Sequence, residues 1–96
     1  MAAYILAQVN VRNPEGYEDY KAKAPAAIEK FGGRYLTRGG KVDCLEGEGP
    51  DCRVVLLEFP DMEAAKAFYD SPEYQEAAKI RQANSDGSFW LLEGLS

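Results

Sequence analysis

The feature that most constrains the fold is an apolar segment at residues 53–59, which reads Arg-Val-Val-Leu-Leu-Glu-Phe. Its length and its branched aliphatic residues are typical of a strand. Val54 and Leu56 fall on one face of such a strand, while Val55 and Leu57 fall on the other. A strand that is apolar on both faces needs a covering layer on each side of its sheet. We therefore expect a sheet that is covered on both faces.

Three further segments have the alternation or the aromatic residues of strands: residues 3–11, 34–46 with a glycine interruption, and 89–93. Gly39 and Gly40 interrupt the second of these segments and predict a bulge or a bend, after which the strand resumes over residues 42–46. Glycine-containing turns are predicted at residues 47–51 and 84–87.

Two helical regions separate the strands. The first begins at Asn13, a good N-cap, and its apolar residues recur at steps of three and four until Gly32 ends it. The second begins at Asp61, restarts at Ser71 with another N-cap followed by proline, and extends to about residue 83. Strands and helices thus alternate in the order β-α-β-β-α-β.

This order predicts one ferredoxin-like α+β domain over residues 1–96. In that fold the four-stranded antiparallel sheet has the order 4-1-3-2, and both helical regions cover one face. The other face would stay apolar and open, and such a patch usually marks an interface. A domain this small also gains stability from a partner. We therefore expect a homodimer through the sheet face, closed into a dimeric α/β barrel.

The composition disfavours several classes of function. The net charge is −5 and no basic run occurs, which disfavours nucleic acids and anionic membranes as partners. The N-terminus lacks the pattern of a secretory signal, and we expect a cytoplasmic protein. The sequence contains no histidine and only two cysteines. Histidine-containing zinc sites and Ser-His or Cys-His pairs are therefore excluded, and we expect no metal and no organic cofactor.

Several segments resemble a single family: residues 32–40 (GGRYLTRGG), 45–47 (LEG), 58–60 (EFP), 67–75 (AFYDSPEYQ), Arg81 and residues 93–94 (EG). Together they resemble the family called domain of unknown function 1330, within the dimeric α/β-barrel superfamily. The resemblance covers nearly the whole chain and implies the fold and the dimer, but no activity. Relatives in the superfamily include cofactor-free monooxygenases, small decyclising or isomerising enzymes and ligand-sensing modules, which are analogies at the level of the fold.

The antiparallel order suggests a first candidate site at one end of the sheet. The turn at residues 47–51 is expected to place Arg38 opposite Glu58, and Tyr4 starts its strand where the strands of Glu58 and Glu93 end. Inside a dimer, Glu58 or Glu93 could act as a catalytic general acid or base, while Arg38 binds an anion. The alternative is a structural Arg–Glu ion pair that fixes the strand register or the dimer.

A second group of candidate substrate-binding residues lies in the second helical region. Tyr74 and Arg81 share one helix face, and Tyr69 is close in sequence. A tyrosine beside an arginine could bind a carboxylate or phenolate. The alternative is that Tyr74 packs on the sheet and Arg81 pairs with Asp70 or Glu73.

These patterns leave two functions open. One is a cofactor-free enzyme or binding protein for a small organic acid or aromatic compound, with its pocket near the sheet and the second helical region. The other is a non-catalytic dimeric ligand-binding or interaction module. An enclosed polar cavity that contains Arg38 and a glutamate would favour the first, and a filled interior would favour the second.

Overall fold

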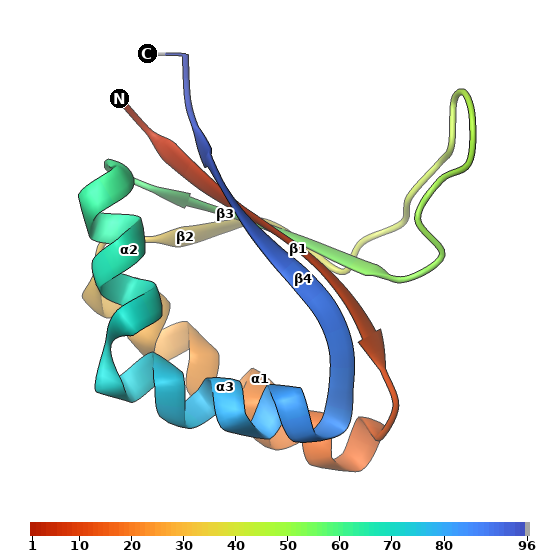
Figure 1. The fold of residues 1–96 in the computed structure, drawn as a ribbon, viewed down its shortest axis with the longest axis horizontal. Helices are drawn as coiled ribbons and strands as arrows, with labels where there is room; N and C mark the ends of the chain where they lie inside the picture. Colours follow the sequence, from red (N-terminus) through yellow and green to blue (C-terminus); the bar gives the residue numbers. More distant parts are fainter. Residues whose placement is uncertain (96) are drawn as a thin grey trace.

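The computed structural model describes residues 1–95, which form a four-stranded sheet with helices on one face (Figure 1). The elements follow in this order: β1 (Ala3–Val11), α1 (Pro14–Lys30), β2 (Arg34–Arg38), β3 (Arg53–Phe59), α2 (Met62–Asp70), α3 (Pro72–Asn84) and β4 (Ser85–Glu93). The strand order is β2-β3-β1-β4 and all neighbours are antiparallel. This topology confirms the predicted ferredoxin-like fold.

The predicted continuation of the second strand over residues 42–46 is wrong. β2 ends at Arg38, and residues 39–52 form an irregular loop that extends away from the sheet (Figure 1). The bulge lies between Tyr35 and Thr37 instead of at the glycines. Gly39 has a φ of +70°, which turns the chain out of the strand.

The predicted turn at residues 84–87 is also wrong, because β4 begins at Ser85 directly after α3. Ser85 and Gly87 already pair with the end of β1, opposite Val11 and Val9. Pairing with β1 therefore overrides the turn preference of this polar, glycine-containing segment.

Both caps predicted for the second helical region are confirmed. Asp61 Oδ1 accepts a hydrogen bond from the Ala64 amide at 2.7 Å, and Ser71 caps α3 in the same way. Asn13 precedes α1 but its side chain makes no cap bond; its Nδ2 donates to Asn84 Oδ1 at 3.0 Å. Within residues 1–95, no helix is long and apolar enough to cross a membrane.

An Asp61→Ala substitution is expected to lower the free energy of unfolding by about 1 kcal/mol, because it leaves an amide of the first turn of α2 without its acceptor. Asn13→Ala is the matched control, since Asn13 is also an N-cap residue but makes no cap bond. It should cost less than about half as much. Urea unfolding followed by circular dichroism measures both values, and equal losses would contradict the role given to Asp61.

The core lies between the helices and the inner face of the sheet, which is the face the helices cover. Alternate residues of β1 are buried there: Ala3, Ile5, Ala7 and Val9. Aromatic rings fill the space under α2 and α3. The centroid of Phe68 lies 4.4 Å from that of Tyr74 and 5.0 Å from that of Phe59. Burial of these large rings contributes much of the stability of so small a protein.

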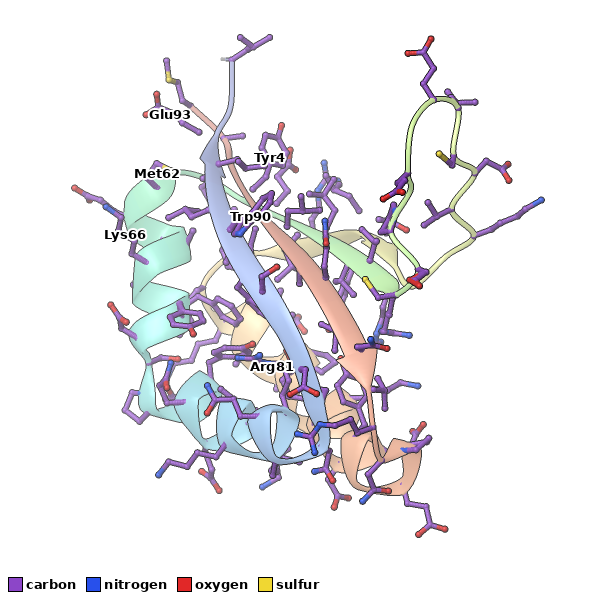
Figure 2. All side chains as sticks on the ribbon, turned by 45° about the vertical axis from the view of Figure 1, so that its right-hand side comes forward. Tyr4, Met62, Lys66, Arg81, Trp90 and Glu93 are labelled. Carbon is purple, nitrogen blue, oxygen red and sulfur yellow. The ribbon has the colours of Figure 1, made fainter. Side chains whose placement is uncertain are left out.

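No helix covers the outer face of the sheet in the described part of the chain (Figure 1). The strand registers place on this face mainly apolar side chains: Tyr4, Leu6, Val54, Leu56, Trp90 and Leu92. Trp90 is 55% exposed and Leu92 is 42% exposed. Tyr4 and Trp90 can be followed in Figure 2. The expected open apolar face is therefore present.

Candidate functional site

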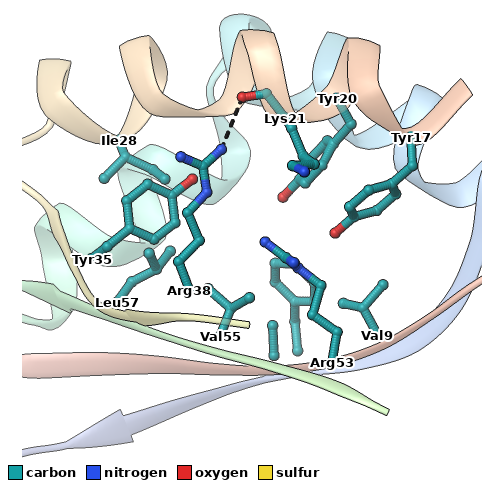
Figure 3. A pocket seen from close by; sticks show the side chains of 12 residues that line it. Val9, Tyr17, Tyr20, Lys21, Ile28, Tyr35, Arg38, Arg53, Val55 and Leu57 are labelled. Atoms are coloured by element: carbon teal, nitrogen blue, oxygen red, sulfur yellow. Dashed lines mark hydrogen bonds between the residues drawn. The ribbon is translucent and has the colours of Figure 1, made fainter. Parts of the chain in front are cut away.

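A small pocket lies between α1 and the inner face of the sheet, where β2 ends and β3 begins (Figure 3). Its floor on the sheet is apolar, and its polar walls come from α1 and from the strand ends. About 20 Å³ is open to the centre of a water-sized sphere, which is room for roughly one or two water molecules. The lining residues are Ala7, Val9, Tyr17, Tyr20, Lys21, Ile28, Tyr35, Arg38, Arg53, Val55, Leu57 and Phe89.

The strand register brings two arginines into this pocket. Arg38 pairs with Val55 across β2 and β3, and Arg53 pairs with Val9 across β3 and β1. Val9 is buried under α1, so both arginines project from the inner face. Because Arg53 precedes Val55 by two residues, the two arginines are diagonal neighbours with Cα atoms roughly 7–8 Å apart. Both arginine side chains therefore line the same pocket.

Arg38 spans the mouth of the pocket. Its Nη2 donates a hydrogen bond to the backbone oxygen of Lys21 in α1, at 3.1 Å (Figure 3). Its guanidinium carbon lies 4.7 Å from the centroid of the Tyr35 ring. The side chain thus connects the end of β2 to α1, through one exposed hydrogen bond that can open.

Arg53 lies deeper in the pocket. Its Nε is buried and has no hydrogen-bond partner in the described residues. Its guanidinium points toward α1, into the space between Arg38 and Tyr17 (Figure 3). Burial raises the pKa of the Tyr17 hydroxyl, and the charge of Arg53 partly opposes that rise. A buried guanidinium donor without an acceptor is costly, so an acceptor that reached this atom would relieve that cost.

Two tyrosines, the partly buried Tyr20 and the fully buried Tyr74, continue the polar wall toward α3. The hydroxyl oxygens of Tyr20 and Tyr74 are 2.8 Å apart, within hydrogen-bond distance. Burial raises the pKa of both hydroxyls, and the charge of Arg81 opposes the rise. Arg81 is 6% exposed, its guanidinium carbon lies 4.1 Å from the centroid of Phe89, and its Nε has no hydrogen-bond partner in the described residues.

The pocket gathers positive charge in an acidic protein. Among residues 1–95, no carboxylate forms an ion pair with Arg38, Arg53 or Arg81, and none lines the pocket. The chain has 16 acidic residues and 11 basic ones, so carboxylates are abundant elsewhere. Lys21 pairs with Glu18, at 3.2 Å. Guanidinium groups without carboxylate neighbours, held against low-dielectric walls, attract an anion.

The predicted pairing of Arg38 with Glu58 is wrong. Glu58 lies opposite Arg34, and Arg34 Nη2 is 2.7 Å from Glu58 Oε1. The difference arises because β2 and β3 are joined by a long loop in place of a tight hairpin, and because the bulge after Tyr35 shifts the register. Glu58 thus forms an ion pair with an arginine, but the partner is Arg34 and not Arg38.

Glu58 and Glu93 also do not converge with Arg38. Glu58 pairs with Tyr4, which was predicted to lie near it, and that row of side chains lies on the outer face. Glu93 pairs with Ala3, whose side chain lies on the inner face, at the far end of β4. The two glutamates therefore leave opposite faces of the sheet, and neither lines the pocket.

The second predicted group is divided between two environments. Tyr69 and Arg81 line an open hollow of about 360 Å³ beside β4, separated from the pocket by Phe89. Arg81 is labelled in Figure 2. Asp86 lines the same hollow, and its carboxylate pairs with Arg12 at 2.8 Å. Tyr74 is fully buried and reaches the pocket only through the hydroxyl of Tyr20.

Arg53, Tyr17, Tyr20 and Tyr35 were not predicted as site residues. The two α1 tyrosines match the spacing of a packing face, so nothing in their pattern separates a pocket wall from core. A signal did exist for Arg53. It shares the period-two face of Val55 and Leu57, which places a charged side chain on the helix-covered side of the sheet.

The fold is that of a ferredoxin-like α+β protein, and the sequence also identifies its family. Residues 2–95 match the family model described as domain of unknown function (DUF1330), so the chain belongs to that family, as the sequence motifs indicated. No curated protein matches the sequence significantly.

Several solved structures are similar to this one, including the following three. A protein of unknown function from Rhodopseudomonas palustris is 27% identical, with a TM-score of 0.77 over 99% of this chain and 83% of that one. SnoaB, a cofactor-independent oxygenase from Streptomyces nogalater, is 16% identical, with a TM-score of 0.70 over 99% and 94%. A dimeric ferredoxin-like protein of unknown function from Jannaschia is 19% identical, with a TM-score of 0.65 over 98% and 100%. At these identities, the last two share the fold alone.

Proposed function

We propose that this protein is a homodimer that binds a small organic acid in the pocket between α1 and the sheet, without a metal or organic cofactor. The observation that carries the proposal is the pair of neighbouring arginines, Arg38 and Arg53, in a pocket that no carboxylate of residues 1–95 lines. Two like charges side by side repel each other, and a bound carboxylate would remove that repulsion. The described pocket suits the charged end of such a ligand.

The lining also indicates how the rest of the ligand would be held. Tyr17 and Tyr35 offer aromatic walls beside the arginines, and the floor is aliphatic. An apolar or aromatic body can pack there while its carboxylate accepts hydrogen bonds from the guanidinium groups. Because the free space is small, entry requires the Arg38 side chain to leave the Lys21 oxygen. Arg38 is exposed, so this motion breaks little packing.

The homodimer is supported by the apolar outer face. Its half-buried or exposed apolar side chains run across β1, β3 and β4, with Trp90 the most exposed of them. A second copy of the same face is the simplest cover for it. The Jannaschia protein, which has the same fold, is described as dimeric. In this arrangement each protomer keeps its own pocket on the inner face.

Cofactor-free chemistry in the same pocket is a second candidate. It is favoured by the hydrogen-bonded hydroxyls of Tyr20 and Tyr74, since Tyr20 lines the pocket and a phenol can donate or accept a proton. Catalytic roles for Glu58 and Glu93 stay predictions. Such a role for Glu58 would require a site on the outer face, within the dimer.

Ligand binding is tested by titrating the protein with benzoate and with benzyl alcohol, its neutral analogue, and recording amide chemical shifts by NMR. We expect benzoate to shift the signals of Tyr17, Tyr35 and Val55 at millimolar concentration or below, and benzyl alcohol to bind at least about tenfold more weakly. Arg38→Gln should weaken benzoate by a similar factor, because it removes one charge-assisted donor.

The matched control is Arg12→Gln, the same change at an exposed arginine that pairs with Asp86 outside the pocket. It should leave benzoate affinity unchanged. Equal affinity for the acid and the alcohol, or equal losses in the two variants, would count against an anion site. If benzoate, acetate and phenylacetate all fail to bind, the proposed function is wrong.

A further inference from the structure

We propose that Gly39 positions the guanidinium of Arg53 inside the pocket, and that Arg53 so placed selects a planar carboxylate over a neutral ligand. This inference rests on the proposed function of the pocket. It assigns a role to a loop residue that lines no part of the pocket itself.

The evidence begins with the close approach of the two residues. A Cβ atom added to Gly39 would lie 2.7 Å from the guanidinium carbon of Arg53, and closer still to its Nη1. Non-bonded carbon atoms pack at roughly 3.5–4.0 Å. The Arg53 guanidinium therefore occupies the space that any side chain at position 39 would need.

The backbone of Gly39 is held in place. Its amide donates a hydrogen bond to the backbone oxygen of Val54, the residue next to Arg53, at 2.9 Å. Its φ of +70° lies in the left-handed region that favours glycine. The side chain of Arg53 thus lies against the backbone of Gly39 at the end of β2, where position 39 has no side chain.

This support gives the guanidinium its direction. Gly39 lies against one side of the Arg53 head. The head turns up from the sheet toward α1, into the middle of the pocket (Figure 3). A Cβ at position 39 would move the flexible end of the arginine before it moved any backbone, so the fold would survive while the donor geometry changed.

The placement also says which ligand group fits. The Nε of Arg53 is buried without a partner in the described residues. Nε and one Nη of a guanidinium present two parallel donors, which match the two oxygens of a planar carboxylate. A neutral alcohol offers one oxygen and leaves the second donor unsatisfied. Arg53 therefore accounts for charge selection, while Arg38 at the mouth adds a further donor.

The test compares three glycine variants for benzoate affinity. Gly39→Ala should weaken benzoate by about tenfold or more, because it displaces the Arg53 fork. Gly47→Ala controls for backbone strain: Gly47 has a φ of +74°, but an added Cβ meets nothing within 4 Å. Gly40→Ala controls for the neighbouring position, where the contact is 3.3 Å to Thr37 Oγ1. Both controls should bind benzoate as the parent chain does.

A double-mutant cycle separates positioning from general damage. Arg53→Lys keeps the charge but removes the fork, and should itself weaken benzoate. If Gly39 acts only through Arg53, the Gly39→Ala/Arg53→Lys double variant should bind no more weakly than Arg53→Lys alone. If the double variant instead loses benzoate affinity by the product of the two single-variant factors, the positioning role is overturned. Parent-like benzoate affinity in Gly39→Ala or in Arg53→Gln would overturn the inference while leaving the proposed function in place.

The position of Arg53 can also be tested without a ligand, by solvent exchange of its side-chain Nε–H. The Nε–H signal of Arg53 should be protected from solvent exchange in the parent and in Gly47→Ala, because this atom is buried, and should lose protection in Gly39→Ala. If no carboxylate binds the parent chain, the proposed function fails and so does carboxylate selection, while this signal still decides whether Gly39 positions Arg53. If Gly39→Ala does not fold, Arg53→Gln still tests charge selection, and failure to fold itself contradicts the expectation that only the side chain moves.

Discussion

A Leu56→Glu variant is expected to sediment as a monomer of 10.6 kDa, whereas the parent chain should sediment at about twice that mass. Leu56 lies on the outer face, opposite Leu6 in β1, and Trp90 continues the same row in β4. In a dimer that buries this face, a glutamate at position 56 would meet apolar side chains from both copies. An unpaired charge in a desolvated interface costs several kcal/mol, enough to separate the protomers at micromolar concentration.

The control is Ala67→Glu, which adds the same side chain at an exposed position of α2, away from the outer face. This variant should remain dimeric. Analytical ultracentrifugation between 1 and 100 micromolar, as a rough range around the affinity of a standard interface, separates the cases. A parent chain that is monomeric throughout, or a Leu56→Glu variant that stays dimeric, would show that the outer face is not the interface.

The fold could be predicted from local signals in the sequence. The alternation of residues 3–11 places Ile5 and Val9 on the covered face, and the structure buries both. Asp61 and Ser71 start helices as their cap chemistry predicts. Strand order followed from the sequence of elements, because few arrangements satisfy β-α-β-β-α-β with antiparallel neighbours. Each of these inferences needs only residues that are close in sequence.

The register of β2 against β3 could not be predicted in this way. It depends on where the chain leaves β2, how long the loop is and whether a residue is bulged, and a one-residue change moves side chains to the other face. The sequence predicted Arg38 opposite Glu58, whereas the structure pairs it with Val55. The error is three positions along β3, and it moves Arg38 away from the glutamate and next to Arg53.

The candidate site depends on contacts between elements distant in sequence, and this is why it was predicted only in part. Arg38 was chosen for a sound reason, since a charged side chain beside two glycines is a costly choice for packing alone. Its neighbours Tyr17 and Arg53 lie 21 positions before it and 15 after it, as their numbers show. Tyrosines on α1 recur at the same helical spacing whether they line a pocket or pack in the core, so only the fold distinguishes the two roles.

High pH is expected to unfold this protein steeply, beginning near pH 10. Burial raises the pKa of Tyr17, Tyr20, Tyr35 and Tyr74 above the ordinary value of 10.0. The folded state therefore keeps phenolic protons that the unfolded chain releases. The stabilisation is complete below the unfolded pKa of about 10 and is lost as pH rises toward the folded pKa. Each tyrosine that ionises only in the unfolded chain contributes about 1.4 kcal/mol per pH unit.

Tyr20 and Tyr74 should dominate this dependence, because Tyr74 is fully buried, Tyr20 is partly buried, and their hydroxyls share a hydrogen bond. Together they predict a fall of about 3 kcal/mol per pH unit above pH 10. Tyr20→Phe should reduce that slope by about 1.4 kcal/mol per pH unit, even though it also lowers stability at neutral pH by about 1 kcal/mol through the lost hydrogen bond.

Ile28→Val is the control, since it removes one buried methyl group and should lower the free energy of unfolding by about 1 kcal/mol equally at every pH. Urea unfolding from about pH 8.5 to about pH 11, which spans roughly one and a half units below and one unit above the ordinary tyrosine pKa, measures the slopes. If Tyr20→Phe and Ile28→Val lower the free energy of unfolding equally at every pH, burial does not raise the pKa of Tyr20. The contact between Tyr20 of α1 and Tyr74 of α3 would then not be maintained in solution.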